Sequence, residues 1–183
     1  MEFIRKNIFY LFATGFLAVM FFFPQVKLKL KDLFFPIAAV ENAVTLTEED
    51  YDIQLKGINT PNINLKELKG KNMVFLNFWG TWCPPCREEW PTIEKLYQSR
   101  KGEIDFVLIA MQDKEEDVRA FMEKNKYTAP VYLAESPITS HVLPRVYPTT
   151  FLLNKDGRIL LKEDGTKDWN SKSVHEFIDH AGK

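Results

Sequence analysis

Cysteine and histidine are scarce in this sequence, which holds two cysteines and three histidines among 183 residues. A structural zinc site needs about four ligands, and His141, His175 and His180 lie far along the chain from the cysteines. His175 and His180 are five residues apart and fall on different faces of a helix, so we interpret them as solvent-facing residues. The shortage of ligands therefore argues against a metal site.

Positive charge is also sparse beyond the N-terminus. Residues 1–31 contain five of the 24 basic residues and one of the 25 acidic residues, which leaves 19 basic and 24 acidic residues in the remainder. That remainder carries a net charge of −5 and has no basic patch interleaved with aromatic residues. This balance argues against nucleic acid as a partner.

Long hydrophobic runs are absent from most of the chain, but residues 8–26 contain no charge. At about 1.5 Å per residue this run reaches roughly 28 Å, just enough for a hydrocarbon core of about 30 Å. We therefore expect a short cytoplasmic N-terminus at 1–7, a transmembrane anchor at 8–26, a juxtamembrane linker at 27–43 and a globular domain at 44–183. The alternatives are a cleaved signal peptide and a buried helix, although the run is longer than the usual signal core and no clear cleavage site follows it.

The two cysteines lie close together, where a predicted strand passes into a predicted helix. An apolar run of strand length at 74–79 stops at Gly80, and Cys83 and Cys86 follow at the head of a segment with helical periodicity. A helix N-terminus stabilises a thiolate, which is the form that attacks a disulfide. Cys83 is therefore the candidate nucleophile, and Cys86, one turn further along, is the candidate resolving thiol.

Pro84 and Pro85 separate the cysteines at the start of the predicted helix. Proline is tolerated in the first turn, but it offers no N–H to a Cys83 thiolate. Weaker stabilisation of the thiolate predicts a reducing pair rather than a strong oxidant. A purely structural disulfide remains the alternative, although its loop would be too small to restrict the unfolded chain much.

The sequence resembles the thioredoxin superfamily, and more closely its membrane-tethered TlpA-like and ResA-like branch. Residues 77–91, with the Cys-Pro-Pro-Cys motif, and residues 147–154 carry this resemblance, which covers about residues 44–181. It implies an α/β thioredoxin-like three-layer sandwich, in which helices flank a mixed central sheet, with an N-terminal transmembrane helix. It implies no bound cofactor.

The same resemblance places Pro148 at the position of a cis-proline that lies opposite the cysteine pair. Composition alone leaves a trans bond as the default. Trp82, Tyr147, Pro148 and Thr149 are accordingly expected to border the substrate groove, where an extended substrate can pair with exposed backbone as an added strand. Tyr147 is bulkier than the residue that most relatives carry there, so we expect it to narrow or restack the groove.

Glu89 lies one helical turn after Cys86, on the same side of the predicted helix. A carboxylate there could shuttle the proton of Cys86, and a glutamate at this offset is a functional acid in the ResA-like proteins. The alternative is an acid favoured only by the helix dipole, which already explains Glu88.

Strand and helix signals alternate through the rest of the domain, which predicts an α/β sandwich. The expected elements are a hairpin strand at 51–58, a short turn at 65–70, a proline-containing helix after the cysteines, a buried strand at 104–111, a helix at 114–125, a strand at 130–133, a short helix at 137–143, a hairpin turning at 154–157 and an amphipathic helix ending near 181.

We therefore expect a single-pass cell-membrane protein whose domain reduces protein disulfides on the extracytoplasmic side, anchored in the lipid bilayer by its N-terminal helix. Counting basic residues does not support this orientation, because they flank the apolar run on both sides. The resemblance implies apocytochrome c as one client and a membrane thiol as electron donor. The alternatives are a disulfide oxidase or isomerase, a peroxiredoxin-like peroxidase, and a tethered binding module with a structural disulfide.

Overall fold

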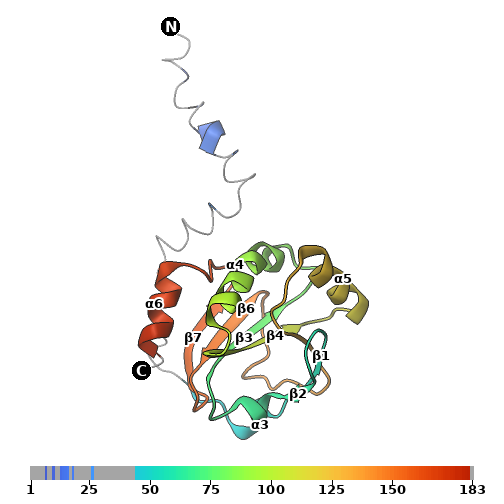
Figure 1. Cartoon of the computed structure of the whole chain (residues 1–183). Coiled ribbons are helices and arrows are strands. Elements are labelled where there is room, and N and C mark those ends of the chain that lie inside the picture. The colour runs from blue at the N-terminus through green and yellow to red at the C-terminus, as the bar shows by residue number, and fades with distance from the viewer. Residues whose placement is uncertain are drawn as a thin grey trace.

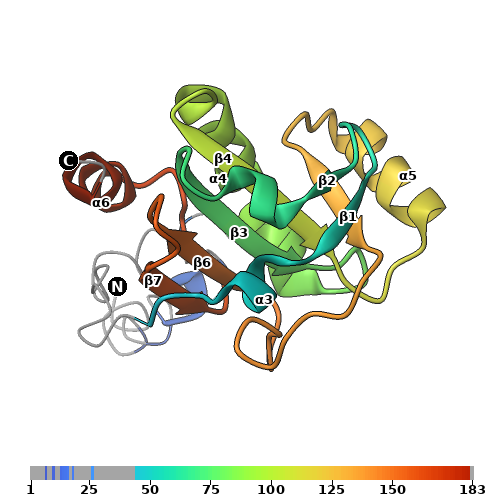
Figure 2. The ribbon, with the colours of Figure 1, turned by 90° about the horizontal axis from the view of Figure 1, so that it is seen from below.

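The computed structural model describes residues 44–181, together with residues 7, 10, 13–16, 18 and 26. Its centre is a seven-stranded sheet (Figures 1 and 2). The strands are β1 (Gln54–Gly57), β2 (Ile63–Asn64), β3 (Met73–Trp79), β4 (Ile104–Ala110), β5 (Val131–Ala134), β6 (Thr149–Leu153) and β7 (Ile159–Asp164). The helices are α3 (Glu48–Tyr51), the 3₁₀ helix η1 (Leu65–Leu68), α4 (Pro84–Arg100), α5 (Glu115–Asn125) and α6 (Lys172–Ala181).

The sheet is mixed, with strand order β2-β1-β5-β4-β3-β6-β7. Strands β3, β4 and β5 are parallel, whereas β1, β2, β6 and β7 are joined by antiparallel pairs. Every residue of β3 is buried, as expected for a central strand covered on both faces. The predicted mixed sheet flanked by helices is confirmed.

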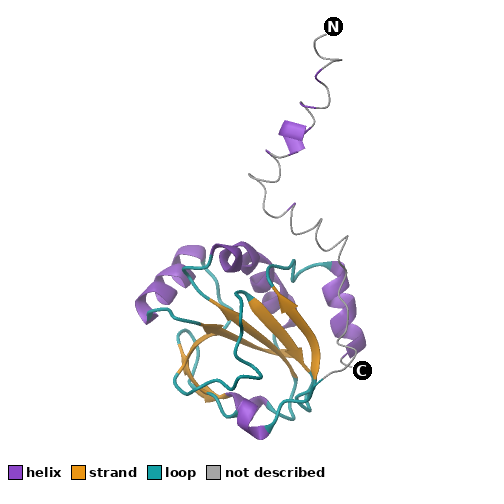
Figure 3. Cartoon of the chain, turned by 180° about the vertical axis from the view of Figure 1, so that it is seen from behind, coloured by secondary structure: helices purple, strands orange, loops and turns teal. Residues whose placement is uncertain are grey.

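Three helices cover one face of the sheet, and their apolar side chains form a single core with the residues beneath them (Figure 3). The helix residues in this core include Trp90, Ile93 and Leu96 of α4, Val118 and Met122 of α5, and Val174 and Ile178 of α6. Both cysteines belong to the same core. The cysteine pair is thus part of the core that lies between the three helices and the sheet.

The opposite face carries much less regular structure. A second core forms where Tyr51 of α3, Leu65 of η1 and Val142 pack on residues of β3 such as Leu76. The short helix predicted at 137–143 is wrong, because this segment forms only a turn in which Val142 N and Leu143 N donate to Thr139 O at 3.1 and 2.8 Å. Prolines at both ends leave too few residues for a stable helix.

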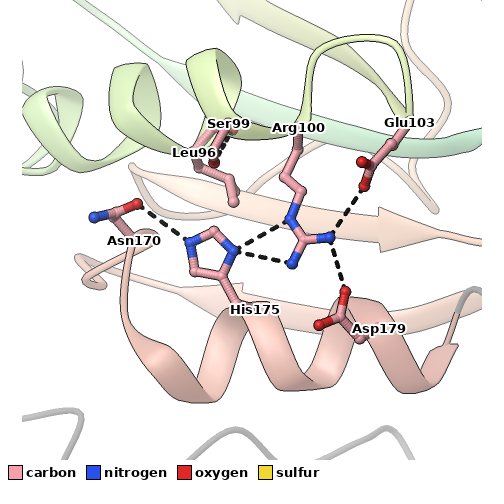
Figure 4. A network of polar contacts seen from close by, with 7 residues as sticks. All are labelled: Leu96, Ser99, Arg100, Glu103, Asn170, His175 and Asp179. Atoms are coloured by element: carbon pink, nitrogen blue, oxygen red, sulfur yellow. Dashed lines mark hydrogen bonds and ion pairs between the residues drawn. The ribbon is translucent and has the colours of Figure 1, made fainter.

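Arg100, at the C-terminus of α4, fastens α6 to the helical face (Figure 4). Its guanidinium donates to His175 Nδ1 at 3.2 Å and to Asp179 Oδ1 at 2.7 Å. The carboxylates of Asp179 and then Glu103 raise the pKa of Arg100. His180 is exposed as predicted, whereas His175 is half buried and its ring also lies 3.2 Å from Asn170 Oδ1.

The predicted anchor at 8–26 and the linker at 27–43 fall largely outside the described residues. Within the part of the chain that is described, no helix has both the length and the apolar character needed to cross a bilayer.

Candidate active site

The cysteine pair lies where the central strand passes into the longest helix of the domain. Strand β3 ends at Trp79, and Cys83 is the N-cap of α4, with Pro84 and Pro85 in the first helical positions. Cys83 and Cys86 form a disulfide with their Cα atoms 5.3 Å apart, and Cys86 N donates to Cys83 Sγ at 3.3 Å. This matches the predicted placement of both thiols at a helix start.

Access to the disulfide is restricted. Cys83 is 3% exposed and Cys86 is fully buried. Of the two cysteines, Cys83 alone keeps some exposed surface, which suits the division into an attacking and a resolving thiol.

Trp82 lies at the surface beside Cys83 and is 47% exposed. Its indole N–H donates to Met111 O at 2.9 Å. A Cβ on Gly80 would come within 2.5 Å of that indole nitrogen, so only glycine at this position lets the ring lie where it does. The backbone turn before the cysteines and the loop after β4 are thus joined through Trp82.

Asp113, which the sequence analysis did not select, is hydrogen-bonded to the same turn before the cysteines. Its carboxylate accepts from Thr81 N at 2.6 Å and from Thr81 Oγ1 at 2.5 Å. One feature of the sequence indicated that Asp113 lies near the cysteines. It follows β4, and the carboxyl ends of the parallel strands β3 and β4 meet at one edge of the sheet.

The Tyr147–Pro148 bond is cis, as the resemblance implied. The Tyr147 ring packs edge-on against Trp82 with centroids 5.5 Å apart, which brings the proline loop beside the cysteine turn. Burial raises the pKa of Tyr147. Thr149 is fully buried, and its hydroxyl oxygen lies within hydrogen-bond distance of two acceptors, Val146 O at 2.9 Å and Asp164 Oδ1 at 2.8 Å. Its side chain therefore supports the loop and does not face the groove.

Glu89 is fully buried in α4, one turn beyond Cys86. One carboxylate oxygen accepts from Asn77 Nδ2 at 3.1 Å, and the other accepts from Trp169 Nε1 at 3.0 Å and from Lys167 N at 3.3 Å. A buried carboxylate needs such donors to offset its lost hydration. Glu89 is thus a buried, hydrogen-bonded acid one helical turn from Cys86, unlike half-exposed Glu88.

The sequence analysis missed the three partners of Glu89. Asn77 carried a usable signal, because it is the one amide in an otherwise apolar strand, and its Nδ2 also donates to Thr150 Oγ1 at 2.8 Å. Lys167 and Trp169 follow β7 and carried no local signal. They reach Glu89 across 78 and 80 residues of chain.

A mixed sheet whose central strand delivers a Cys-x-x-Cys disulfide to a helix N-terminus, beside a cis-proline loop, defines a thiol-disulfide oxidoreductase of thioredoxin fold. Residues 52–178 match the Redoxin family. The chain belongs to that family.

Two sequence relatives and one solved structure illustrate the likeness. The thiol-disulfide oxidoreductase ResA of Halalkalibacterium halodurans is 33% identical over 135 residues, which cover 72% of this chain and 74% of ResA. The thioredoxin-like protein YneN of Bacillus subtilis is 35% identical over 111 residues, 59% of this chain, and the match spans just under two thirds of YneN, 65%. The crystal structure of a secreted Mycobacterium tuberculosis disulfide oxidoreductase homologous to E. coli DsbE has a TM-score of 0.61 at 18% identity, covering 73% of this chain and 99% of that one. The ResA-like membership expected from the sequence is confirmed.

Proposed function

We propose that this protein is a membrane-tethered, extracytoplasmic reductase of protein disulfides. The observation that carries the proposal is the Cys83–Cys86 disulfide at the head of α4. With Pro84 and Pro85 in the first helical positions, the helix offers fewer N–H groups to a Cys83 thiolate, which favours a reducing pair over a strongly oxidising one. The names of the ResA relatives support thiol-disulfide exchange and leave its direction open.

The reaction proceeds through two exchanges. The Cys83 thiolate attacks one sulfur of the client disulfide, which forms a mixed disulfide and releases the other client sulfur as a thiolate. Cys86 then loses its proton and attacks Cys83 Sγ, which closes the internal disulfide and releases the second client thiolate. The client gains two electrons from the enzyme, and a dithiol donor then reduces the Cys83–Cys86 disulfide and is itself oxidised to a disulfide.

Glu89 serves the second exchange as the acid-base residue for Cys86. It lies one turn from Cys86, and its three donors hold the carboxylate in a fixed position. A buried thiol needs a nearby acceptor for its proton before it can act as a nucleophile.

The proposals of a membrane tether and of an extracytoplasmic location both rest on the uncharged run at 8–26. We propose that this run spans the membrane once and holds the domain outside the cytoplasm, where a membrane thiol supplies electrons. Apocytochrome c, whose haem-binding cysteines must stay reduced, is the client that the ResA-like resemblance favours. A cysteine introduced into the linker at 27–43 should react with an impermeant maleimide in intact cells, and labelling only after lysis would contradict the orientation.

The direction of the reaction is tested by the reduction potential of the purified full chain. The protein is equilibrated in thiol-disulfide buffers, and the fluorescence of Trp79 and Trp82 reports the disulfide. A value near or below about −270 mV supports a reductase, whereas a value near about −120 mV identifies an oxidant that inserts disulfides. Trapped mixed disulfides in Cys86→Ser exclude a binding module, and peroxide consumption by that variant would indicate a peroxidase.

A further inference from the structure

The segment 135–147 joins β5 to the cis-proline and contains no helix or strand. Loops of this length without secondary structure are uncommon in compact domains and are usually functional. Its first residues are held by β1, because Glu135 N donates to Gln54 O and Gln54 N donates to Ser136 Oγ, both at 2.8 Å. The middle of the segment needs a separate anchor.

That anchor is Asp50, the last acid of the four-residue helix α3 and only 2% exposed. Its Oδ1 accepts a short hydrogen bond from the Thr139 hydroxyl and lies 3.3 Å from His141 Nδ1. Figure 2 shows the loop passing beside α3. One buried carboxylate oxygen is thus shared by two side chains of the loop.

The other oxygen of Asp50 has a different task. Oδ2 accepts from Thr47 N at 2.8 Å and from Thr47 Oγ1 at 2.9 Å, which closes a capping box on α3. Burial alone would raise the pKa of Asp50, but the hydrogen bonds from Thr139 and Thr47 hold it below its ordinary value. If Asp50 were only a helix cap, Oδ2 would suffice and the loop would have no reason to converge on Oδ1.

The consequence of this anchor appears further along the loop. Thr139 O accepts from Val142 N and Leu143 N, and Val142 is buried in the core. Beyond it, Leu143 and Val146 are 46% and 49% exposed, although both are apolar. Tyr147 follows immediately and packs on Trp82. The loop therefore leads from a fixed buried point to an apolar surface beside the disulfide.

We propose that Asp50 is a positioning residue for client binding: through Oδ1 it holds Thr139 and His141, and so sets the loop wall at 143–147 against which a protein disulfide docks. The inference rests on the proposed function of the same site. Because Asp50 touches neither sulfur nor client, it acts on affinity for a protein client and leaves the sulfur chemistry unchanged.

Two matched variants separate this role from mere stability. Thr139→Val removes the hydroxyl bound to Oδ1, and Thr47→Val removes the hydroxyl bound to Oδ2. Each full-length variant is assayed with a protein disulfide, oxidised insulin, and with a small aromatic disulfide, and its thermal midpoint is measured. Thr139→Val should raise KM for insulin on the order of tenfold at unchanged kcat, with no change toward the small disulfide. Thr47→Val should lower the thermal midpoint and leave both KM values unchanged.

The proposal is overturned if Thr139→Val leaves KM for insulin unchanged, if it slows both substrates equally, or if Thr47→Val raises KM to the same extent. Failure of the proposed function looks different: the wild-type protein would then have an oxidising potential and reduce neither substrate. In that case the same variants are compared for the oxidation of reduced insulin, which must dock in the same groove, and the same KM criterion applies.

Discussion

The two faces of the sheet differ in how they are built and in what they carry. One face is covered by α4, α5 and α6, and its core contains both cysteines and lies around Glu89. The other face is covered by a four-residue helix, a 3₁₀ turn and the loop 135–147. The cysteines and the proposed proton acceptor Glu89 therefore belong to the helical face, whereas the proposed client-docking segment 143–147 belongs to a loop.

This division has a physical logic. Thiol exchange requires sulfur atoms and a proton acceptor held in fixed geometry, which helices provide better than loops. Recognition of varied protein clients requires a surface that can differ between relatives without disturbing that geometry. The difference teaches that chemistry and client choice can be changed separately in this molecule, and substitutions on the two faces should show it.

The largest expected effect is on the helical face, at the cysteines. Cys83→Ser should abolish disulfide reduction, because no thiolate remains to attack the client. Cys86→Ser should also stop turnover but accumulate a mixed disulfide through Cys83, visible on a non-reducing gel. Accumulation of client adducts by Cys83→Ser and not by Cys86→Ser would reverse the assigned order of the thiols.

Glu89→Gln should slow the second exchange by about 10²- to 10⁴-fold, because the amide keeps the shape but cannot take the proton of Cys86. Stopped-flow measurement of client release from the mixed disulfide reports this step, and the first attack by Cys83 should remain unchanged. Glu88→Gln is the matched control on the same helix. A comparable slowing in the control would point to helix charge in place of proton transfer.

The two cores should also differ in what they contribute to stability. Ile93→Ala on the helical face removes a fully buried side chain and should cost about 2 to 5 kcal/mol of unfolding free energy. Val142→Ala on the loop face removes two methyl groups and should cost about 1.5 kcal/mol. Reversible denaturant unfolding measures both, and a larger loss for Val142→Ala would mean that the loop is a principal part of the core.

An effect of similar size, which fades at low pH, concerns Asp50. Its folded-state pKa is lowered, so its carboxylate contributes stability above the ordinary aspartate pKa of about 3.9, and that contribution is lost as pH falls through the lowered value. Asp50→Asn should therefore destabilise the protein by about 1 to 2 kcal/mol at pH 7 and by progressively less below about pH 4. A difference from the wild type that stays constant down to pH 2 would show that the charge is irrelevant.

Local motifs made much of this molecule predictable from sequence. The strand, Gly80, the cysteine pair and its helix form one continuous stretch, so their arrangement follows from short-range rules. The cis-proline required the family resemblance, because an X-Pro bond is trans by default. The mixed sheet followed from the same resemblance and from the alternation of strands and helices.

The parts that could not be predicted depend on distant contacts. Lys167 and Trp169 meet Glu89 only after the sheet has brought β7 beside the helical face, and Thr139 meets Asp50 across 89 residues. The helix expected at 137–143 is prevented locally by the prolines at both of its ends, and distant contacts add to this effect. Its apolar and polar residues satisfy the core and a buried carboxylate from another part of the chain, and this tertiary demand overrides local periodicity.

The near-complete burial of the Cys83–Cys86 disulfide has a consequence for electron traffic. A small thiol in the surrounding medium meets almost no sulfur surface of the oxidised pair. We therefore expect exchange with such thiols to be slow, because access to the sulfur is one of the factors that set the rate. On the proposed function, we expect the domain to keep a redox state of its own while small thiols in the medium have another.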